Sequence, residues 1–232
     1  MIFRVMVAAL YILAAGSAGA QEKPGLKDQK EKISYIIGME IGGNFRKQSI
    51  DIDPDILTRG IKDGLSGAKP LLSEQEAREV MAAFEKEMRA RQEAAQKAAG
   101  EKNKKEGEVF LAQNKKKEGV KTLPSGLQYK VIKPGTGKKP AATDTVTTQY
   151  KGTLVDGTEF DSSYKRGKPA TFPVNGVIPG WTEALQLMEE GAKWQLFIPS
   201  NLAYAERGAG RVIGPHATLI FEVELISIQE KK

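Results

Sequence analysis

Side chains able to carry out nucleophilic, acid–base or metal chemistry are few in this sequence of 232 residues. The chain contains no cysteine and a single histidine, His216, so a catalytic triad or a zinc site lacks its partner residues. His216 follows Pro215 directly and precedes a strand pattern, where a structural role is the simpler interpretation. We therefore expect no metal and no cofactor.

Three short motifs imitate ligand sites without completing them. Asp51–Asp55 alternates acids as a calcium loop does, but the sixth position is Ile56 rather than glycine and the twelfth is Lys62 rather than glutamate. The glycines of 135–138 lack the spacing of a phosphate loop, and those of 208–214 lack the strand-to-helix context of a dinucleotide site. Helix capping and turns explain all three motifs.

What remains is a set of aromatic and apolar side chains around one acid in the C-terminal half. The members are Tyr150, Phe160, Asp161, Phe172, Val177, Ile178, Trp181, Tyr204, Ile213 and Phe221. The core of a small domain is the alternative explanation for this set. A buried hydroxyl or carboxylate, however, needs a polar partner, so Tyr150, Asp161 and Tyr204 favour a pocket over a plain core.

Alternating hydrophobicity predicts the strands that must carry these residues. Apolar and polar residues alternate with a period of two over residues 145–150, 193–198 and 219–225, as in antiparallel strands with one buried face. Between them, Pro179 and Gly180 precede a short helical stripe that begins at Trp181. The expected fold is α+β, an antiparallel half-barrel sheet wrapping one short helix.

The N-terminal half has helical periodicity instead. Ile33, Ile37, Ile41 and Phe45 recur at four-residue steps between residues 28 and 48. A second helix is expected to follow an N-cap at Asp53, with proline at its first position, and to end near Gly67. These patterns predict an all-α segment.

A third helix is predicted from a capping box at Ser73 to about Glu118. Arg89–Glu108 combines alanine with charged residues and contains no large apolar side chain, as in a solvent-bridging helix. Gly100 and Gly107 are expected to weaken it, and a disordered linker is the alternative. Residues 119–126 are expected to form a hinge.

The first 20 residues have the pattern of a signal peptide. Arg4 precedes an apolar stretch that ends at Ala15, and Ala18–Ala20 provides a small-residue cleavage site. The alternative is an uncleaved membrane anchor. Periplasmic export is expected, with outer-membrane association or secretion as alternatives. The net charge of +6 is not concentrated in one patch, so nucleic-acid binding is not expected.

Residues 122–232 resemble the FK506-binding protein (FKBP) family of peptidyl-prolyl cis-trans isomerases. The resemblance lies in YKGTLVDGTEFDSS, KPATFPVNGVIPGWTEAL and YAERGAGRVIGPHATLIFEVEL, which stand in the family's order. The N-terminal half resembles the helical dimerisation domain of the macrophage infectivity potentiator group. In two places the chain departs from the family pattern: Ala170 replaces an aromatic residue and Gly214 replaces a proline.

The resemblance implies a role for each pocket residue. It implies a catalytic role for Tyr150, Phe160, Asp161, Trp181, Tyr204 and Phe221, and substrate binding by Phe172, Val177, Ile178, Val212 and Ile213. Trp181 is then the pocket floor, the Ile178 N–H and the Tyr204 hydroxyl hold carbonyls, and Asp161 orients groups rather than acting as a base. Macrolides of the FK506 and rapamycin type are expected inhibitors.

The resemblance and the composition together predict a domain order. Residues 1–20 are the signal peptide, 21–72 a helical dimerisation domain, 73–121 the connecting helix with its hinge, and 122–232 the isomerase domain. The leading hypothesis is a homodimeric isomerase and folding chaperone that acts on proline-containing, unfolded or nascent exported polypeptides. The rival hypothesis is a non-catalytic chaperone or binding module, which Ala170 and Gly214 favour.

Overall fold

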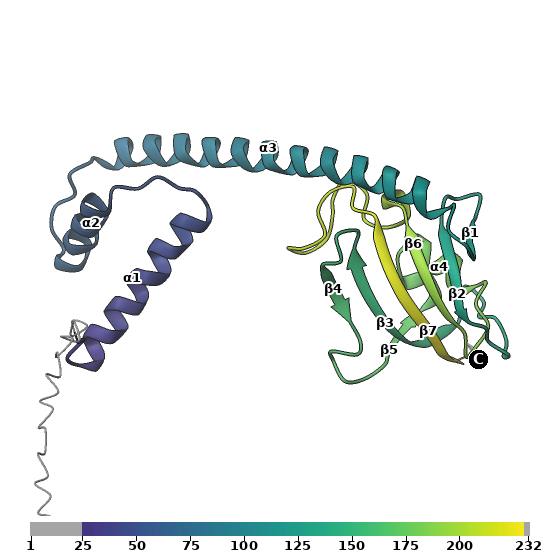
Figure 1. Cartoon of the computed structure of the whole chain (residues 1–232). Coiled ribbons are helices and arrows are strands. Elements are labelled where there is room, and N and C mark those ends of the chain that lie inside the picture. The colour runs from purple at the N-terminus through teal and green to yellow at the C-terminus, as the bar shows by residue number, and fades with distance from the viewer. Residues whose placement is uncertain (1–24, 230–232) are drawn as a thin grey trace, which may run out of the picture. The chain divides into compact units, whose positions relative to one another are not determined.

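A computed structural model of the chain describes residues 25–229. The expected signal peptide lies outside these residues. The helices are α1 (Gln29–Lys47), α2 (Pro54–Ser66), α3 (Glu74–Asn114) and α4 (Pro179–Leu185), with single 3₁₀ turns η1 (Val174–Gly176) and η2 (Ser200–Leu202). The strands are β1 (Val120–Thr122), β2 (Gln128–Lys133), β3 (Thr145–Leu154), β4 (Glu159–Ser162), β5 (Ala170–Pro173), β6 (Lys193–Ile198) and β7 (Leu219–Gln229). Figure 1 shows these elements along the chain.

The described chain forms two compact units that divide between Ser73 and Glu74. The first contains α1 and α2, and the second contains α3 and the sheet. The fold class is α+β, as predicted. Among the described residues, no helix is long and apolar enough to cross a membrane.

In the first unit, local sequence signals place the helix ends. The Asp28 side chain accepts a hydrogen bond from the Glu31 N–H, and the Asp53 side chain accepts two at the start of α2. Gly67 closes α2 with a φ of 67°, a conformation that costs glycine little. Neither helix buries a single residue, so the apolar residues of α1 lack a core within one chain.

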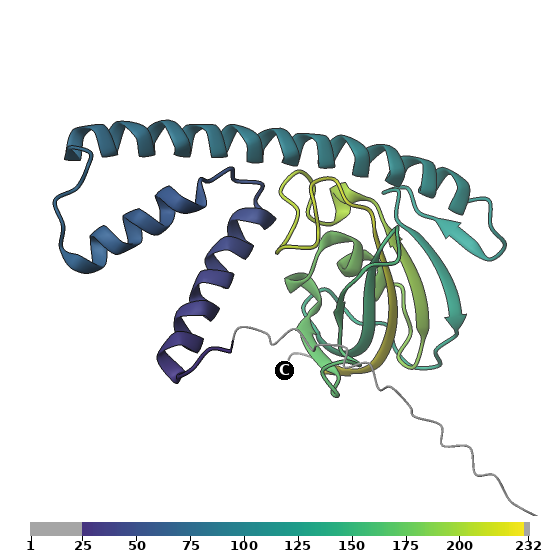
Figure 2. The same cartoon turned by 60° about the vertical axis from the view of Figure 1, so that its left-hand side comes forward.

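The sheet of the second unit is antiparallel throughout, in the order β1-β2-β6-β7-β3-β4, and β5 also pairs with β3. The predicted alternation is present: Val146, Thr148 and Tyr150 are buried on one face of β3. Helix α4 packs against that same core, where Leu185 and Met188 are fully buried. Figure 2 shows the sheet curving around α4.

Two expectations for the connecting segment differ from the structure. Residues 119–126 are not simply a hinge, because Val120–Thr122 pairs with β2 as β1. Helix α3 also continues through Gly100 and Gly107, and both glycines are buried. They lie against residues 215–218, where a Cβ at Gly107 would overlap Thr218 and a Cβ at Gly100 would be in tight contact with Pro215 and His216. The charged composition correctly predicts an exposed helix only for its N-terminal part.

One buried residue breaks the predicted alternation of β6. Phe197 lies on the face opposite Leu196, yet only 5% of it is exposed. The Phe110 ring of α3 lies 5.9 Å from the Phe197 ring, so α3 covers this position from outside the sheet.

Leu185→Ala should lower the free energy of unfolding of the second unit by about 2–5 kcal/mol, because it leaves a cavity in a closed core. Urea denaturation followed by far-UV circular dichroism measures this change. Leu187→Ala, two residues away and 37% exposed, is the control and should cost about 1 kcal/mol or less. Equal losses in the two variants would contradict the assignment of α4 to the core.

Candidate functional site

The floor of the candidate site is the first turn of α4. Pro179 occupies the first helical position and Trp181 follows on the buried side, with 4% of its surface exposed. Gly180 allows this helix to approach β6 closely, because a Cβ there would lie 2.5 Å from Ile198 Cγ2. The indole is therefore held against the inner face of the sheet.

Three aromatic rings contact the indole edge to face, and a fourth packs on one of them. The ring centroid of Trp181 lies 5.2 Å from those of Tyr150 and Phe221 and 6.0 Å from that of Phe172. The corresponding angles between the ring planes are 89°, 82° and 83°. Phe160 meets Phe221 in the same way at 5.4 Å. Such pairs contribute about 0.5–1.5 kcal/mol each beyond buried area, so they hold the rings in fixed orientations.

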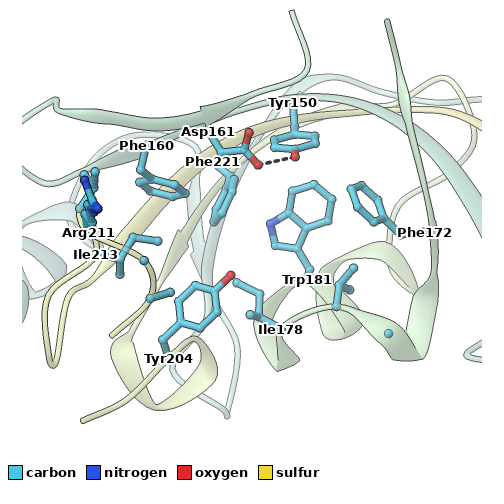
Figure 3. A pocket seen from close by; sticks show the side chains of 15 residues that line it. Tyr150, Phe160, Asp161, Phe172, Ile178, Trp181, Tyr204, Arg211, Ile213 and Phe221 are labelled. Carbon is cyan, nitrogen blue, oxygen red and sulfur yellow. Dashed lines mark hydrogen bonds between the residues drawn. The ribbon is translucent and has the colours of Figure 1, made fainter. Parts of the chain in front are cut away.

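These rings enclose a cavity of about 630 Å³ that opens to solvent. Its walls contain every residue that the sequence analysis nominated for catalysis or substrate binding: Tyr150, Phe160, Asp161, Phe172, Val177, Ile178, Trp181, Tyr204, Val212, Ile213 and Phe221. Figure 3 shows the cavity, with Trp181 between Tyr150, Phe172 and Phe221. Four further residues that were not predicted also line it: Gly176, Ala209, Gly210 and Arg211.

A polar network closes one side of the cavity. The Tyr150 hydroxyl donates to Asp161 Oδ2 at 2.5 Å, and the Ser162 N–H donates to Asp161 Oδ1 at 2.8 Å. Arg166 donates to both the Tyr150 hydroxyl, at 2.7 Å, and Asp161 Oδ1, and its guanidinium lies over the Tyr150 ring. Arg166 was not predicted, and its only signal in the sequence is a cation five residues after Asp161.

This network sets the charge of its members. Burial acts to raise the pKa of Asp161, but hydrogen bonds from Tyr150 and Arg166 outweigh it and hold that pKa below its usual value. Burial, and then the hydrogen bond to Asp161, raise the pKa of Tyr150. At neutral pH Asp161 is thus a carboxylate whose two oxygens accept hydrogen bonds, and it is poorly suited to remove a proton.

Three donors at the cavity have no acceptor among the described residues. These are the backbone N–H of Ile178, the hydroxyl of Tyr204 and the indole Nε1–H of Trp181. In Figure 3 the Tyr204 hydroxyl points toward the centre of the cavity. Of the three, the Trp181 Nε1–H is buried, and a buried donor without a partner is unusual. A ligand rich in carbonyl groups would satisfy all three donors.

The described residues contain no cluster of three or more His, Asp or Glu side chains placed to hold a metal ion. The site combines apolar walls, three donors without acceptors among the described residues, and two charged side chains, Asp161 and Arg211. Such a site can bind an amide and stabilise a change in its shape, whereas it has no nucleophile poised for covalent chemistry.

Comparison with known proteins relates both halves of the chain to described families. Residues 30–131 match the family described as the domain amino-terminal to FKBP-type peptidyl-prolyl isomerase. Residues 136–226 match FKBP-type peptidyl-prolyl cis-trans isomerase.

Similar proteins match over most of the chain. Outer membrane protein MIP of Legionella longbeachae is 50% identical, over 98% of each chain. Peptidyl-prolyl cis-trans isomerase Mip of Coxiella burnetii is 46% identical, over 89% of this chain and 90% of its own. The crystal structure of FkpA from Escherichia coli matches with a TM-score of 0.68 and 37% identity, over 88% of this chain and 99% of its own.

Arg166→Leu should raise the pKa of Asp161, because it removes one hydrogen bond and the nearby positive charge. The depressed pKa of Asp161 contributes stability that is present above its unfolded pKa and is lost as pH falls through the folded pKa, and the variant should lose this contribution. Carbon-detected NMR titration of the carboxyl measures the shift. Lys165→Leu, whose amine pairs with Glu159, is the control. An unchanged Asp161 pKa in Arg166→Leu would contradict the network.

Proposed function

The chain belongs to the FKBP-type peptidyl-prolyl cis-trans isomerases, and we propose that the cavity above Trp181 is where it rotates the bond before proline. Members of this family bind proline-containing peptides, and the chain is an enzyme of that type. One observation carries the assignment of the site. An edge-on aromatic floor lies next to a backbone N–H, that of Ile178, which has no acceptor among the described residues.

The mechanism follows from the physical nature of the barrier. Amide resonance resists rotation with a barrier of about 18–20 kcal/mol, and rotation breaks no σ bond. A twisted amide has lost resonance, so its carbonyl is less dipolar than that of the planar amide. An apolar cavity therefore disfavours the planar ground state more than the twisted state, which is differential binding of the transition state.

The residues divide this task between them. Trp181 supports the proline ring, Tyr150, Phe160 and Phe221 exclude water, and the Ile178 N–H holds a carbonyl of the substrate. One backbone hydrogen bond contributes about 0.5–1.5 kcal/mol net, whereas each tenfold gain in rate requires about 1.4 kcal/mol. The shape of the cavity and the removal of water must therefore supply most of the acceleration.

Asp161 acts in this mechanism as an orienting group. Its carboxylate holds the Tyr150 hydroxyl, and Arg166 balances its charge. The Tyr150 ring is thus held edge to face against Trp181. Phe172, Val177, Val212 and Ile213 complete the surface that contacts the residues flanking proline.

We further propose that the protein works as a homodimer joined through its N-terminal helices. Half or more of the surface of Ile36 and Ile37 is exposed in one chain, and α1 buries no residue. A second copy of the same helices would bury this surface. Two linked cavities would raise the effective concentration of a bound client, which supports chaperone activity.

Export to the periplasm is part of the same proposal. The signal-peptide pattern of residues 1–20 supports it, as does the name of the Legionella longbeachae relative, an outer membrane protein. Unfolded or nascent exported chains would then be the clients, and macrolides of the FK506 and rapamycin type would compete with them for the cavity. The functional parts of the exported chain would then be the dimerisation domain (21–72), the connecting helix (73–121) and the isomerase domain (122–232), as expected from the sequence.

A proline tetrapeptide assay tests the catalytic site. Trp181→Leu should lower kcat/KM at least about tenfold, because it removes the floor that excludes water, and the chain should remain folded. Trp194→Leu is a matched control, because Trp194 is buried against Tyr129 and does not line the cavity. Loss of activity in proportion to loss of stability in both variants would show that Trp181 serves chiefly as core. An inactive parent chain that still suppresses client aggregation would favour the non-catalytic chaperone.

Ile37→Asp should convert the dimer to a monomer, because it places a charge in the shared apolar surface. Sedimentation velocity should report half the parent mass, while activity toward a tetrapeptide stays within about twofold, since one cavity suffices for a short substrate. Lys30→Asp, which adds a carboxylate to the first turn of α1 without removing an apolar side chain, should remain dimeric. A dimeric Ile37→Asp variant would count against the proposed interface.

A further inference from the structure

The C-terminal part of α3 has a face of small and amide-bearing residues that packs on the sheet unit. Gly100, Asn103, Gly107, Phe110 and Asn114 recur at three- and four-residue steps and therefore share one side of the helix. We call these residues the α3 contact face. The only buried residues of α3 belong to it.

The N-terminal part of the α3 contact face packs against residues 215–218, which lead into β7. A Cβ at Gly100 would lie 3.2 Å from side-chain atoms of both Pro215 and His216. A Cβ at Gly107 would overlap the hydroxyl of Thr218. A side chain at Gly107 would thus require Thr218 to move, and one at Gly100 would be in tight contact with Pro215 and His216.

The C-terminal part of the α3 contact face is bound directly to the sheet. Asn114 Nδ2 donates to Gln128 Oε1 at 3.0 Å, and Gln128 Nε2 donates to the Leu111 carbonyl at 3.0 Å. The Phe110 ring lies on the Phe197 ring nearby. The contact face is thus anchored at its end independently of residues 215–218.

Pro215 and His216, which α3 contacts, form the base of a loop that lines the cavity. We call residues 204–217 the pocket loop; Tyr204 and residues 209–213 line the cavity. Its tip is closed by two hydrogen bonds between Ala209 and Ile213, at 2.8 and 3.2 Å. Its base is closed by the His216 N–H, which donates to the Ala205 carbonyl at 2.7 Å. Figures 1 and 2 both show this loop next to the middle of α3.

The base of the pocket loop has an unfavourable backbone conformation. Ala205 and His216 have φ values of 49° and 55°, in the left-handed region that side chains with a Cβ rarely adopt. Such conformations persist only where the surroundings hold them. At this point Asn103 Nδ2 donates to the Pro215 carbonyl at 2.8 Å, and a Cβ at Gly214 would lie 2.9 Å from the same nitrogen.

We propose that Asn103 is a positioning residue of the isomerase: from α3 it holds the base of the pocket loop, and thereby the Tyr204 and Ile213 wall, in the shape that binds substrate. The inference rests on the proposed function of the cavity. Asn103 does not touch the substrate and acts through Pro215. Gly214 contributes because its lack of a side chain lets the Asn103 amide reach the carbonyl.

The test uses full-length protein and a proline tetrapeptide. Asn103→Asp keeps the shape of the side chain but replaces the donor with an acceptor that faces the Pro215 carbonyl, and Asn103→Leu removes all polarity. Both should raise KM about three- to tenfold, because a loosened wall binds substrate less tightly, while kcat changes less than about twofold. Gln113→Leu, an exposed amide on the same helix, is the control and should leave both constants unchanged.

Two further measurements separate positioning from ordinary packing. Amide hydrogen exchange at Ile213 should accelerate in both Asn103 variants, while exchange in the core strand residue Val223 stays as in the parent. Gly214→Ala should raise KM in the same direction by displacing the Asn103 amide. In the double variant with Asn103→Asp, the two effects should not add, because both act through one contact.

The outcomes are distinct. Unchanged KM and unchanged exchange at Ile213 in folded Asn103 variants would overturn the proposal. Additive effects of the Asn103 and Gly214 substitutions would do so as well. If Asn103→Asp does not fold, Asn103→Leu and Gly214→Ala test the same contact. A parent chain without isomerase activity would refute the proposed function instead, and the exchange measurement would still decide whether Asn103 holds the loop.

Discussion

The close packing of α4 against β6 is the contact on which the rest of the site depends. Gly180 lies so near Ile198 that no side chain fits between them, and this approach brings Trp181 to the inner face of the sheet. The rings of Tyr150 and Phe221 can then meet the indole edge to face. The same turn leaves the backbone N–H of Ile178 without an acceptor among the described residues. The start of α4 therefore offers a hydrogen-bond donor to a ligand.

The negative charge at the cavity wall is held by neighbouring hydrogen-bond donors. Asp161 lies at the wall, but a tyrosine, an arginine and a backbone N–H occupy its oxygens. An ionised group in this state has low basicity. The reaction needs a dry surface rather than a proton acceptor, which explains why a chain with one histidine and no cysteine can be an enzyme.

Much of the sheet unit could be predicted from the sequence, because strand alternation and the Pro179 helix start are local signals. The resemblance of short motifs to a known family identified the cavity residues. What could not be predicted depends on segments far apart in the chain. Asn103 is hydrogen-bonded to Pro215, which lies 112 residues later in the chain. Gly107 was expected to weaken α3, but it allows the helix to pack closely against Thr218. The burial of Phe197 on the other face of β6 could not be predicted, because nothing local indicates that Phe110 covers it.

The uneven support of α3 has a consequence for how the molecule denatures. From Gly100 onward the helix shares buried contacts with the sheet, whereas its earlier turns bury no residue and are stabilised by alanine content and by pairs such as Arg91 with Glu87. The local stability of this continuous helix is therefore uneven along its length. Its N-terminal turns can fray and re-form while the C-terminal turns stay folded, so disturbance at the start of the helix fades before it reaches the residues beside the cavity.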